Sequence, residues 1–342
     1  MREMQFAWVV LAVVSCNDAV PDTGQHRELH TIAGETMGTT YTVKVVSPED
    51  EFDLARTRLT IEKRLAQINA RMSHYLVDSE IATFNRSYTT EPYPLSSETV
   101  DLIAKANEIS RVSSGAFDVT VGPFVDAWGF GPKGPPATLP DSQVLDGLRL
   151  FVGYELLAVD REASAVRKLR KELTVDLSAI AKGYAVDAVS AVLTDFGSTD
   201  YLVEIGGELR ASGNGQQDSP WRVAIERPDP GQVSKVRIIE LRDQSIATSG
   251  EYRNYYERDG VRVSHTIDPR TGRPVSHQLL AVSVLADQCA SADARATALE
   301  VLGPEDGYAL AIEQGWEALF LILNEDGRFV ERATPTFNQH VE

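Results

Sequence analysis

Asp293 and Thr297 are the side chains in this sequence whose types and spacing best suit metal chemistry. They lie four residues apart in an alanine-rich stretch that begins with a good N-cap, Ser291, and ends before Gly303-Pro304. This pattern predicts a helix from Ser291 to about Leu302, with the carboxylate and the hydroxyl on one face near its positive end. Two oxygen ligands so placed suit a hard cation such as Mg²⁺. Alternatively, Asp293 only complements the helix dipole and Thr297 bonds to its own backbone.

His265 is the candidate for proton transfer. Residues 252–257 and 261–267 read as two strands joined by a tight Asp259-Gly260 turn, which places His265 on an inward face among apolar side chains. A histidine there is either a satisfied core side chain or a base, since its ordinary pKa of about 6.5 suits neutral pH. Asp268 to Gly272 closes the second strand with a Pro/Gly turn.

A carboxylate and an ammonium flank a predicted strand-to-helix turn. Residues 173–177 read as a short strand that ends near Asp176, and a helix that starts near Lys182 reaches Leu193. Carbonyls in the intervening turn are not committed to helix bonds, so one of them can serve a metal. Tyr201 to Arg210 reads as one buried strand with a bulge or close approach at its glycine pair.

Other elements must support these residues. Residues 39–45 alternate as a strand does, residues 53–68 and 97–113 have helical periodicity, and residues 221–225 form another strand. A short helix begins at Asp78-Ser79. Glycines and aromatics in residues 114–130 could line a pocket for a flat ring, although the same pattern also suits core packing.

Length and charge restrict the class of protein. The 342 residues are 43% hydrophobic and 24% charged, an ordinary globular composition with ample material for a core. The net charge of −17 makes duplex nucleic acid an unsuitable partner, because phosphate binding needs many Lys and Arg contacts. With only Cys16 and Cys289, no disulfide framework is available.

The N-terminus has the features of an export signal. The apolar run at residues 6–14 is too short to span a bilayer, and it ends in Val13-Val14-Ser15-Cys16, which resembles a bacterial lipoprotein box. We expect residues 1–16 to form a lipoprotein signal peptide with Cys16 lipidated, and residues 17–34 to be a flexible tether. A plain secretory peptide and a buried N-terminal helix are the alternatives.

Seven blocks in order resemble the ApbE family, the FAD:protein FMN transferases, from about Met37 to Leu323. The tyrosine block differs mildly from the common Ser-Thr-Tyr, because His74 stands at its middle position. The blocks are Met37-Gly38-Thr39, Met72-Ser73-His74-Tyr75, residues 115–123, residues 175–184, Glu204-Ile205-Gly206-Gly207, residues 264–272 and residues 292–298.

The resemblance implies an α+β fold of mixed, largely antiparallel sheets with packed helices and a cleft for FAD. The catalytic domain would span residues 35–330, with a C-terminal tail at residues 331–342. Mg²⁺ would take the Ala179 carbonyl, the Asp293 carboxylate and the Thr297 hydroxyl. FAD would contact Met37, Tyr75, Ala116, Phe117, Asp118, Asp176, Lys182 and Ile267.

The implied reaction moves FMN from FAD to a Ser or Thr hydroxyl of an acceptor protein and releases AMP. The residues leave open whether His265 or Asp293 is the base. They also leave open an FAD pyrophosphatase that gives FMN and AMP, and a lipoprotein that binds FAD without chemistry. Cys16 and the following residue predict a lipid-anchored protein that faces the periplasm, where family acceptors are commonly found.

Overall fold

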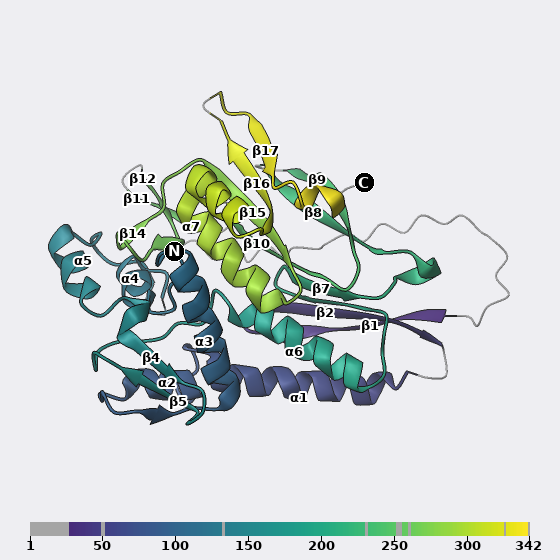
Figure 1. Ribbon diagram of the computed structural model, residues 1–342, viewed down its shortest axis with the longest axis horizontal. Coiled ribbons are helices and arrows are strands. Elements are labelled where there is room, and N and C mark those ends of the chain that lie inside the picture. The colour runs from purple at the N-terminus through teal and green to yellow at the C-terminus, as the bar shows by residue number, and fades with distance from the viewer. Residues whose placement is uncertain are drawn as a thin grey trace.

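An eight-stranded antiparallel sheet forms the centre of the molecule, with strand order β1-β2-β6-β7-β10-β15-β16-β17 (Figure 1). The computed structural model describes residues 27–48, 52–131, 134–229, 232–250, 255–258, 261–324 and 326–340. The strands of this sheet are β1 (Arg27–Thr36), β2 (Thr39–Pro48), β6 (Tyr201–Ile205), β7 (Glu208–Ser212), β10 (Ser245–Gly250), β15 (Leu279–Ala286), β16 (Glu317–Leu323) and β17 (Phe329–Ala333).

Helices and four smaller sheets surround this centre, which confirms the α+β prediction. The α-helices are α1 (Leu54–Met72), α2 (Glu80–Arg86), α3 (Ser97–Val112), α4 (Gly122–Ala127), α5 (Ser142–Arg149), α6 (Ala181–Asp195) and α7 (Cys289–Glu313). Short 3₁₀ helices lie at Tyr154–Leu156, Gln216–Asp218 and Phe337–His340. The smaller sheets pair β5 (Ala165–Lys168) with both β3 (Tyr93–Pro94) and β4 (Leu157–Asp160), β8 (Trp221–Asp229) with β9 (Gln232–Leu241), β11 (Tyr255–Arg258) with β12 (Val261–Ser264), and β13 (Ile267–Asp268) with β14 (Arg273–Pro274).

The main sheet is covered on both faces. In β6, Val203 and Ile205 pack into a core with α1, α3 and α6, whereas Leu202 packs into a second core with the β8–β9 hairpin. Successive side chains of a strand point to opposite faces, so a strand buried on both sides is apolar throughout. Figure 1 shows α6 and α7 lying one after the other along the same face, and α7 contacts β10 and β15 there.

The N-termini of α6 and α7 cap each other. Asp187 of α6 accepts hydrogen bonds from the Cys289 and Ala290 N–H groups of α7 at 2.9 and 3.0 Å, and Asp293 Oδ2 of α7 accepts from the Gly183 N–H of α6 at 3.0 Å. Neither helix has a capping side chain at its own N-cap. Each carboxylate therefore satisfies free N–H groups at the positive end of the other helix.

The predicted start of α7 is therefore wrong. The helix begins at Cys289 rather than after Ser291, because the cap comes from Asp187 of another helix and not from a local hydroxyl. Ser291 lies in the first turn, where its Oγ is 3.3 Å from Lys105 Nζ.

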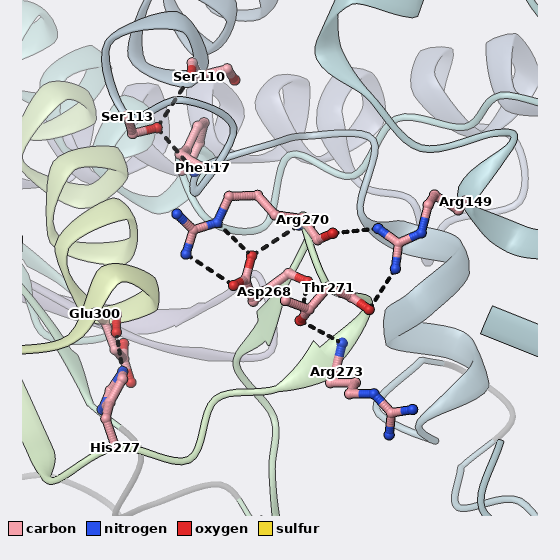
Figure 2. Close-up of polar contacts among 10 residues, drawn as sticks. All are labelled: Ser110, Ser113, Phe117, Arg149, Asp268, Arg270, Thr271, Arg273, His277 and Glu300. Atoms are coloured by element: carbon pink, nitrogen blue, oxygen red, sulfur yellow. Dashed lines mark hydrogen bonds and ion pairs between the residues drawn. The ribbon is translucent and has the colours of Figure 1, made fainter. Parts of the chain in front are cut away.

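The sequence predicts that this helix ends before Gly303-Pro304. In the structure α7 is only kinked there and continues to Glu313. Gly303 has φ 80°, and Pro304 has no N–H to donate to the Glu300 carbonyl four residues earlier. His277 Nε2 lies 2.6 Å from that carbonyl oxygen (Figure 2), while His277 Nδ1 accepts from the Leu279 N–H at 3.3 Å. These contacts require a neutral ring that carries its proton on Nε2, and burial accordingly lowers the pKa of His277.

Two strand predictions need correction. Residues 173–177 are not a strand: the Asn85 side chain bonds both the N–H and the carbonyl of Val175, and the Asp176 N–H donates to the Val119 carbonyl. These contacts replace a strand ladder. Residues 201–210 form two strands rather than one, because Gly206 and Gly207, with φ 61° and 102°, make the turn between β6 and β7.

Most of the predicted hairpin is present, but its second strand is shorter. β11 and β12 pair as expected, with Tyr255 opposite Ser264, while residues 252–254 and the Asp259-Gly260 turn lie outside the described residues. β12 ends at Ser264, so His265 lies in the connection to β13 and not on a strand face. The expected turn after Asp268 is formed, since the Asp268 carbonyl accepts from the Gly272 N–H at 2.7 Å.

The folded part of the chain extends beyond the predicted domain limits. β1 starts at Arg27, so residues 27–34 belong to the main sheet and not to a tether. In the expected tail, residues 331–333 lie in β17 and Phe337 is fully buried in the second core. Residues 1–26, which include Cys16, lie outside the described part. Among the described helices, none has the length and apolar character that crossing a membrane requires.

Gly183 allows α6 and α7 to approach closely, because it has no side chain. An added Cβ there would lie 2.4 Å from the Cys289 carbonyl oxygen, whereas one at Gly147 in α5 would meet nothing within 4 Å. We expect Gly183→Ala to lower the free energy of unfolding by about 1–3 kcal/mol through overpacking. Gly147→Ala is the matched control and should raise it by about 0.5–1 kcal/mol. Urea unfolding measures both, and equal effects of the two variants would contradict the packing argument.

Candidate active site

A cavity of about 480 Å³ lies where α6, α7, β7 and the end of β10 meet the loops at residues 116–121 and 265–269. Its walls include eleven of the twelve residues predicted from the sequence, brought together from distant parts of the chain. They are Tyr75, Ala116, Phe117, Asp118, Asp176, Ala179, Lys182, His265, Ile267, Asp293 and Thr297.

Met37 is the predicted residue that does not line this cavity. It lies in the turn between β1 and β2 with φ 50°, and it packs against the core on the helix side of the sheet. The turn is nevertheless close to the cavity edge. An added Cβ on Gly206, which lines the cavity, would lie 2.9 Å from Thr39 Cγ2.

One face of α7 forms the acidic wall of the cavity. Asp293 is 3% exposed and bonds the start of α6 as described above, while Thr297 Oγ1 lies 3.3 Å from Ser249 Oγ at the end of β10. Glu300 follows one turn after Thr297, is 2% exposed and lies 3.3 Å from Thr266 Oγ1. The sequence analysis overlooked Glu300, although its seven-residue distance from Asp293 places it on the same helix face.

Lys182 lies between two carboxylates. Its Nζ donates to Glu208 Oε1 and is 3.9 Å from Asp293 Oδ1. Burial would lower the pKa of Lys182, but the charges of Asp293 and Glu208 outweigh it and raise that pKa, so the ammonium stays protonated. Burial raises the pKa of Glu208, and the Asp293 charge adds to this effect. Glu208 is a further residue that the sequence analysis did not select, although it directly follows the Gly206-Gly207 pair.

Ala179 lines the cavity from the turn that precedes α6. Gly183 is the third residue of α6, so its N–H has no carbonyl partner within the helix and donates to Asp293 Oδ2 instead. The Ala179 carbonyl comes before the N-cap residue, Ile180, and is therefore not part of the regular hydrogen bonds of α6, as the sequence analysis expected.

His74 holds Asp176 in place. His74 Nδ1 lies 3.1 Å from Asp176 Oδ1 and 3.4 Å from Ser178 Oγ, and the His74 ring lies 4.0 Å from the Tyr75 ring. Burial would lower the pKa of His74, but its hydrogen bond to Asp176 and the charges of Asp176 and Asp126 raise it. Burial would raise the pKa of Asp176, but the same hydrogen bond, with that from Ser178, lowers it.

Asp118 joins two loops at the edge of the cavity. Its Oδ1 accepts from the N–H and the hydroxyl of Thr120 at 2.8 and 2.7 Å, and its Oδ2 accepts from the Tyr154 N–H at 2.7 Å. Burial raises the pKa of Asp118 to about 6, although these bonds oppose the shift. Phe117 is fixed in turn by Ser113, whose hydroxyl accepts from the Phe117 N–H at 3.1 Å (Figure 2).

The loop that carries His265 and Ile267 is anchored by a dense polar network. Asp268 accepts three hydrogen bonds of 2.9 Å from the backbone and the guanidinium of Arg270, and Arg149 of α5 donates to the Arg270 and Thr271 carbonyls (Figure 2). His265 packs at the edge of Phe130, with ring centroids 6.2 Å apart. The histidine therefore lines the cavity from a braced connection.

Comparison with known proteins identifies the family. A model of the ApbE family matches residues 37–320. The chain belongs to the ApbE family. The FAD:protein FMN transferase of Vibrio cholerae serotype O1 is 42% identical to it over 306 residues, which are 90% of this chain and 91% of that protein.

Solved structures of the ApbE family share the fold. The flavin transferase ApbE from Vibrio cholerae has a TM-score of 0.86 at 39% identity, with 92% of this chain and 100% of that chain covered. The apo form of the Pseudomonas stutzeri flavinyl transferase ApbE has a TM-score of 0.86 at 39% identity, with 94% and 99% covered. The resemblance inferred from the seven blocks is thus confirmed.

The contact between His74 and Asp176 predicts a pH-dependent contribution to stability. Because the folded protein raises the pKa of His74, the contribution is complete below the unfolded value of about 6.5 and is lost as pH rises through the folded value. We expect His74→Thr to reduce the free energy of unfolding more at pH 6 than at pH 9. Urea unfolding of both proteins at the two pH values measures this, and a pH-independent difference would refute the contribution of this pair.

Proposed function

We propose that this protein transfers the FMN part of FAD to a Ser or Thr hydroxyl of an acceptor protein and releases AMP. The observation that carries the proposal is that one cavity joins an apolar part, with Phe117 and Phe130, to a charged part around Lys182 and Asp293. A flavin ring suits the first part, and a diphosphate needs positive charge, which Lys182 supplies in the second. The relatives named FAD:protein FMN transferase and flavin transferase support the same reaction.

The donors around Asp293 fit a hard divalent cation. Asp293, Thr297 and the Ala179 carbonyl would hold Mg²⁺ through oxygen atoms, the ligand type it prefers. Within the part of the chain that the structure describes, no group of three or more His, Cys, Asp or Glu side chains is placed to hold a metal. The site would therefore rely on mixed oxygen donors together with phosphate oxygens of FAD, as Mg²⁺ commonly does in phosphoryl-transfer enzymes.

The chemistry requires one bond to form and one to break. The acceptor hydroxyl oxygen forms a bond to the FMN phosphorus, the phosphorus–oxygen bond to AMP breaks, and the hydroxyl proton passes to His265 or to Asp293. A bound Mg²⁺ would neutralise negative charge on the diphosphate. Lys182 adds a fixed positive charge, and Tyr75, Phe117 and Ile267 would position the flavin end of FAD.

The two alternatives differ in what accepts FMN. In a pyrophosphatase, water replaces the protein hydroxyl, and in a storage protein no bond breaks. A half-buried lysine between two carboxyl groups, in a cavity that a histidine also lines, favours chemistry over storage, because binding alone needs no such arrangement at the phosphate.

The function is tested by incubating the protein with FAD, Mg²⁺ and the extracytoplasmic domain of a flavin-dependent redox protein from the same cell. We expect a fluorescent flavin band on the acceptor in a denaturing gel and an equal amount of AMP. AMP without a labelled acceptor would favour the pyrophosphatase, and the absence of both signals would favour binding only.

Asp293→Asn tests most directly whether Asp293 binds the cation. Asparagine keeps an oxygen that can accept from the Gly183 N–H, so the link between α6 and α7 is retained while the charge is removed. We expect transfer to fall by about 10²–10³-fold or more, since a group that stabilises developing charge is lost. Initial rates across a Mg²⁺ titration measure this, and a wild-type rate at low Mg²⁺ would exclude Asp293 as a ligand.

His265→Asn distinguishes a catalytic role of His265 from a structural one. If His265 takes the proton in the transition state, the variant should bind FAD as the wild type does but transfer FMN about 10²–10⁴-fold more slowly. Flavin fluorescence titration gives the affinity, and a single-turnover assay gives the rate. A parallel loss of FAD affinity would assign His265 to the structure of the cavity instead.

We also propose that Cys16 carries a lipid anchor and that the protein faces the periplasm, where it meets its acceptor. The lipobox-like residues 13–16 support this location. Bacterial lipoproteins carry several acyl chains, as stable anchoring requires. We expect the wild type in the membrane fraction and Cys16→Ser in the soluble fraction. Equal recovery of both in the soluble fraction would favour an ordinary secretory signal.

A further inference from the structure

Glu208 has one carboxylate oxygen that the rest of the protein leaves unsatisfied. Its side chain is 4% exposed and lines the cavity. Oε1 accepts from Lys182 Nζ, but Oε2 is buried and has no hydrogen-bond partner among the described residues. A buried carboxylate oxygen without a partner is costly, so the cavity is expected to supply one when it is occupied.

The local charge indicates what kind of partner this is. Glu208 and Asp293 both lie next to Lys182 Nζ, so a single ammonium is shared by two carboxyl groups and leaves Glu208 Oε2 without a partner. The diphosphate of FAD is itself anionic and would be repelled by an unpaired oxygen in a buried wall. A cation between the two removes this repulsion, whereas a neutral water would leave it in place.

On this basis we propose that Glu208 is a further carboxylate of the divalent-cation site, with Oε2 directed to the cation or to a water that the cation holds. This inference rests on the proposed function and deepens it. Glu208 would then have two tasks, since Oε1 positions Lys182 for the phosphates while Oε2 strengthens cation binding opposite Asp293. Such outer partners commonly change metal affinity by about 10–100-fold.

Glu204 provides a matched control. It lies in the adjacent strand β6, its carboxylate interacts with Lys182 through charge, and it accepts from the Gly207 N–H at 2.8 Å, but it does not line the cavity. Glu204→Gln therefore removes one negative charge near Lys182 without changing the cavity wall, and glutamine keeps an acceptor for Gly207.

The test measures Mn²⁺ binding to the full chain by electron paramagnetic resonance, with and without FAD, and FAD affinity separately in EDTA. We expect Glu208→Gln to weaken Mn²⁺ binding by about 10-fold or more, and Glu204→Gln by clearly less. Thermal unfolding reports whether each variant is folded. Should Glu208→Gln be unfolded, Glu208→Asp keeps the charge with a shorter reach and should bind Mn²⁺ more weakly than the wild type.

The outcomes separate this inference from the proposed function. Equal Mn²⁺ affinities of wild type and a folded Glu208 variant would overturn the role of Glu208 while leaving flavin transfer intact. A Glu208→Gln variant that loses FAD affinity in EDTA but keeps Mn²⁺ affinity would also overturn it, because Glu208 would then act only on Lys182. A wild type that neither binds Mn²⁺ nor transfers flavin would contradict the proposed function itself.

Discussion

The reciprocal capping of α6 and α7 is the interaction on which the cavity depends. Asp187 caps the N-terminus of α7, and Asp293 caps that of α6. Both caps can form only when the two helix ends are in contact. Gly183 permits that approach, since any side chain would meet the Cys289 carbonyl. The same contact places Asp293 beside Lys182 and close to the Ala179 turn. A packing constraint between two helices thereby creates the charged end of the site.

Charge balance explains why the chain buries several ionisable groups there. Lys182 is half-buried between Asp293 and Glu208, and the acidic wall continues along α7 to Glu300. Burial of an excess of carboxylates is unfavourable, and so is placing an anionic diphosphate against them. In the reaction that we propose, a divalent cation bound together with FAD would lower both costs.

Rigid connections, rather than regular strands, hold much of the remaining cavity wall. The Asn85 side chain hydrogen-bonds the backbone of Val175, as a neighbouring strand would. Asp118 joins two loops, and Asp268 and Arg149 fix the connection after His265. Each of these contacts satisfies backbone groups that would otherwise need a sheet partner. This arrangement leaves side chains free to point into the cavity while their backbones stay fixed, which suits a site that must orient a large substrate.

The sequence by itself determined the family, the α+β class, the main helices and eleven of the twelve residues that were expected around one site, because these follow from local periodicity and from motif blocks. It misplaced the start of α7 and the residues 173–177, since the deciding partners there, Asp187 and Asn85, are distant in sequence. It also continued the strand before His265 too far, because Ile267 pairs with Pro274 of β14 and not with β11. Glu208 and His74 acquired their roles only in the folded chain. Charge and burial depend on neighbours from several elements, and tertiary structure alone brings those neighbours together.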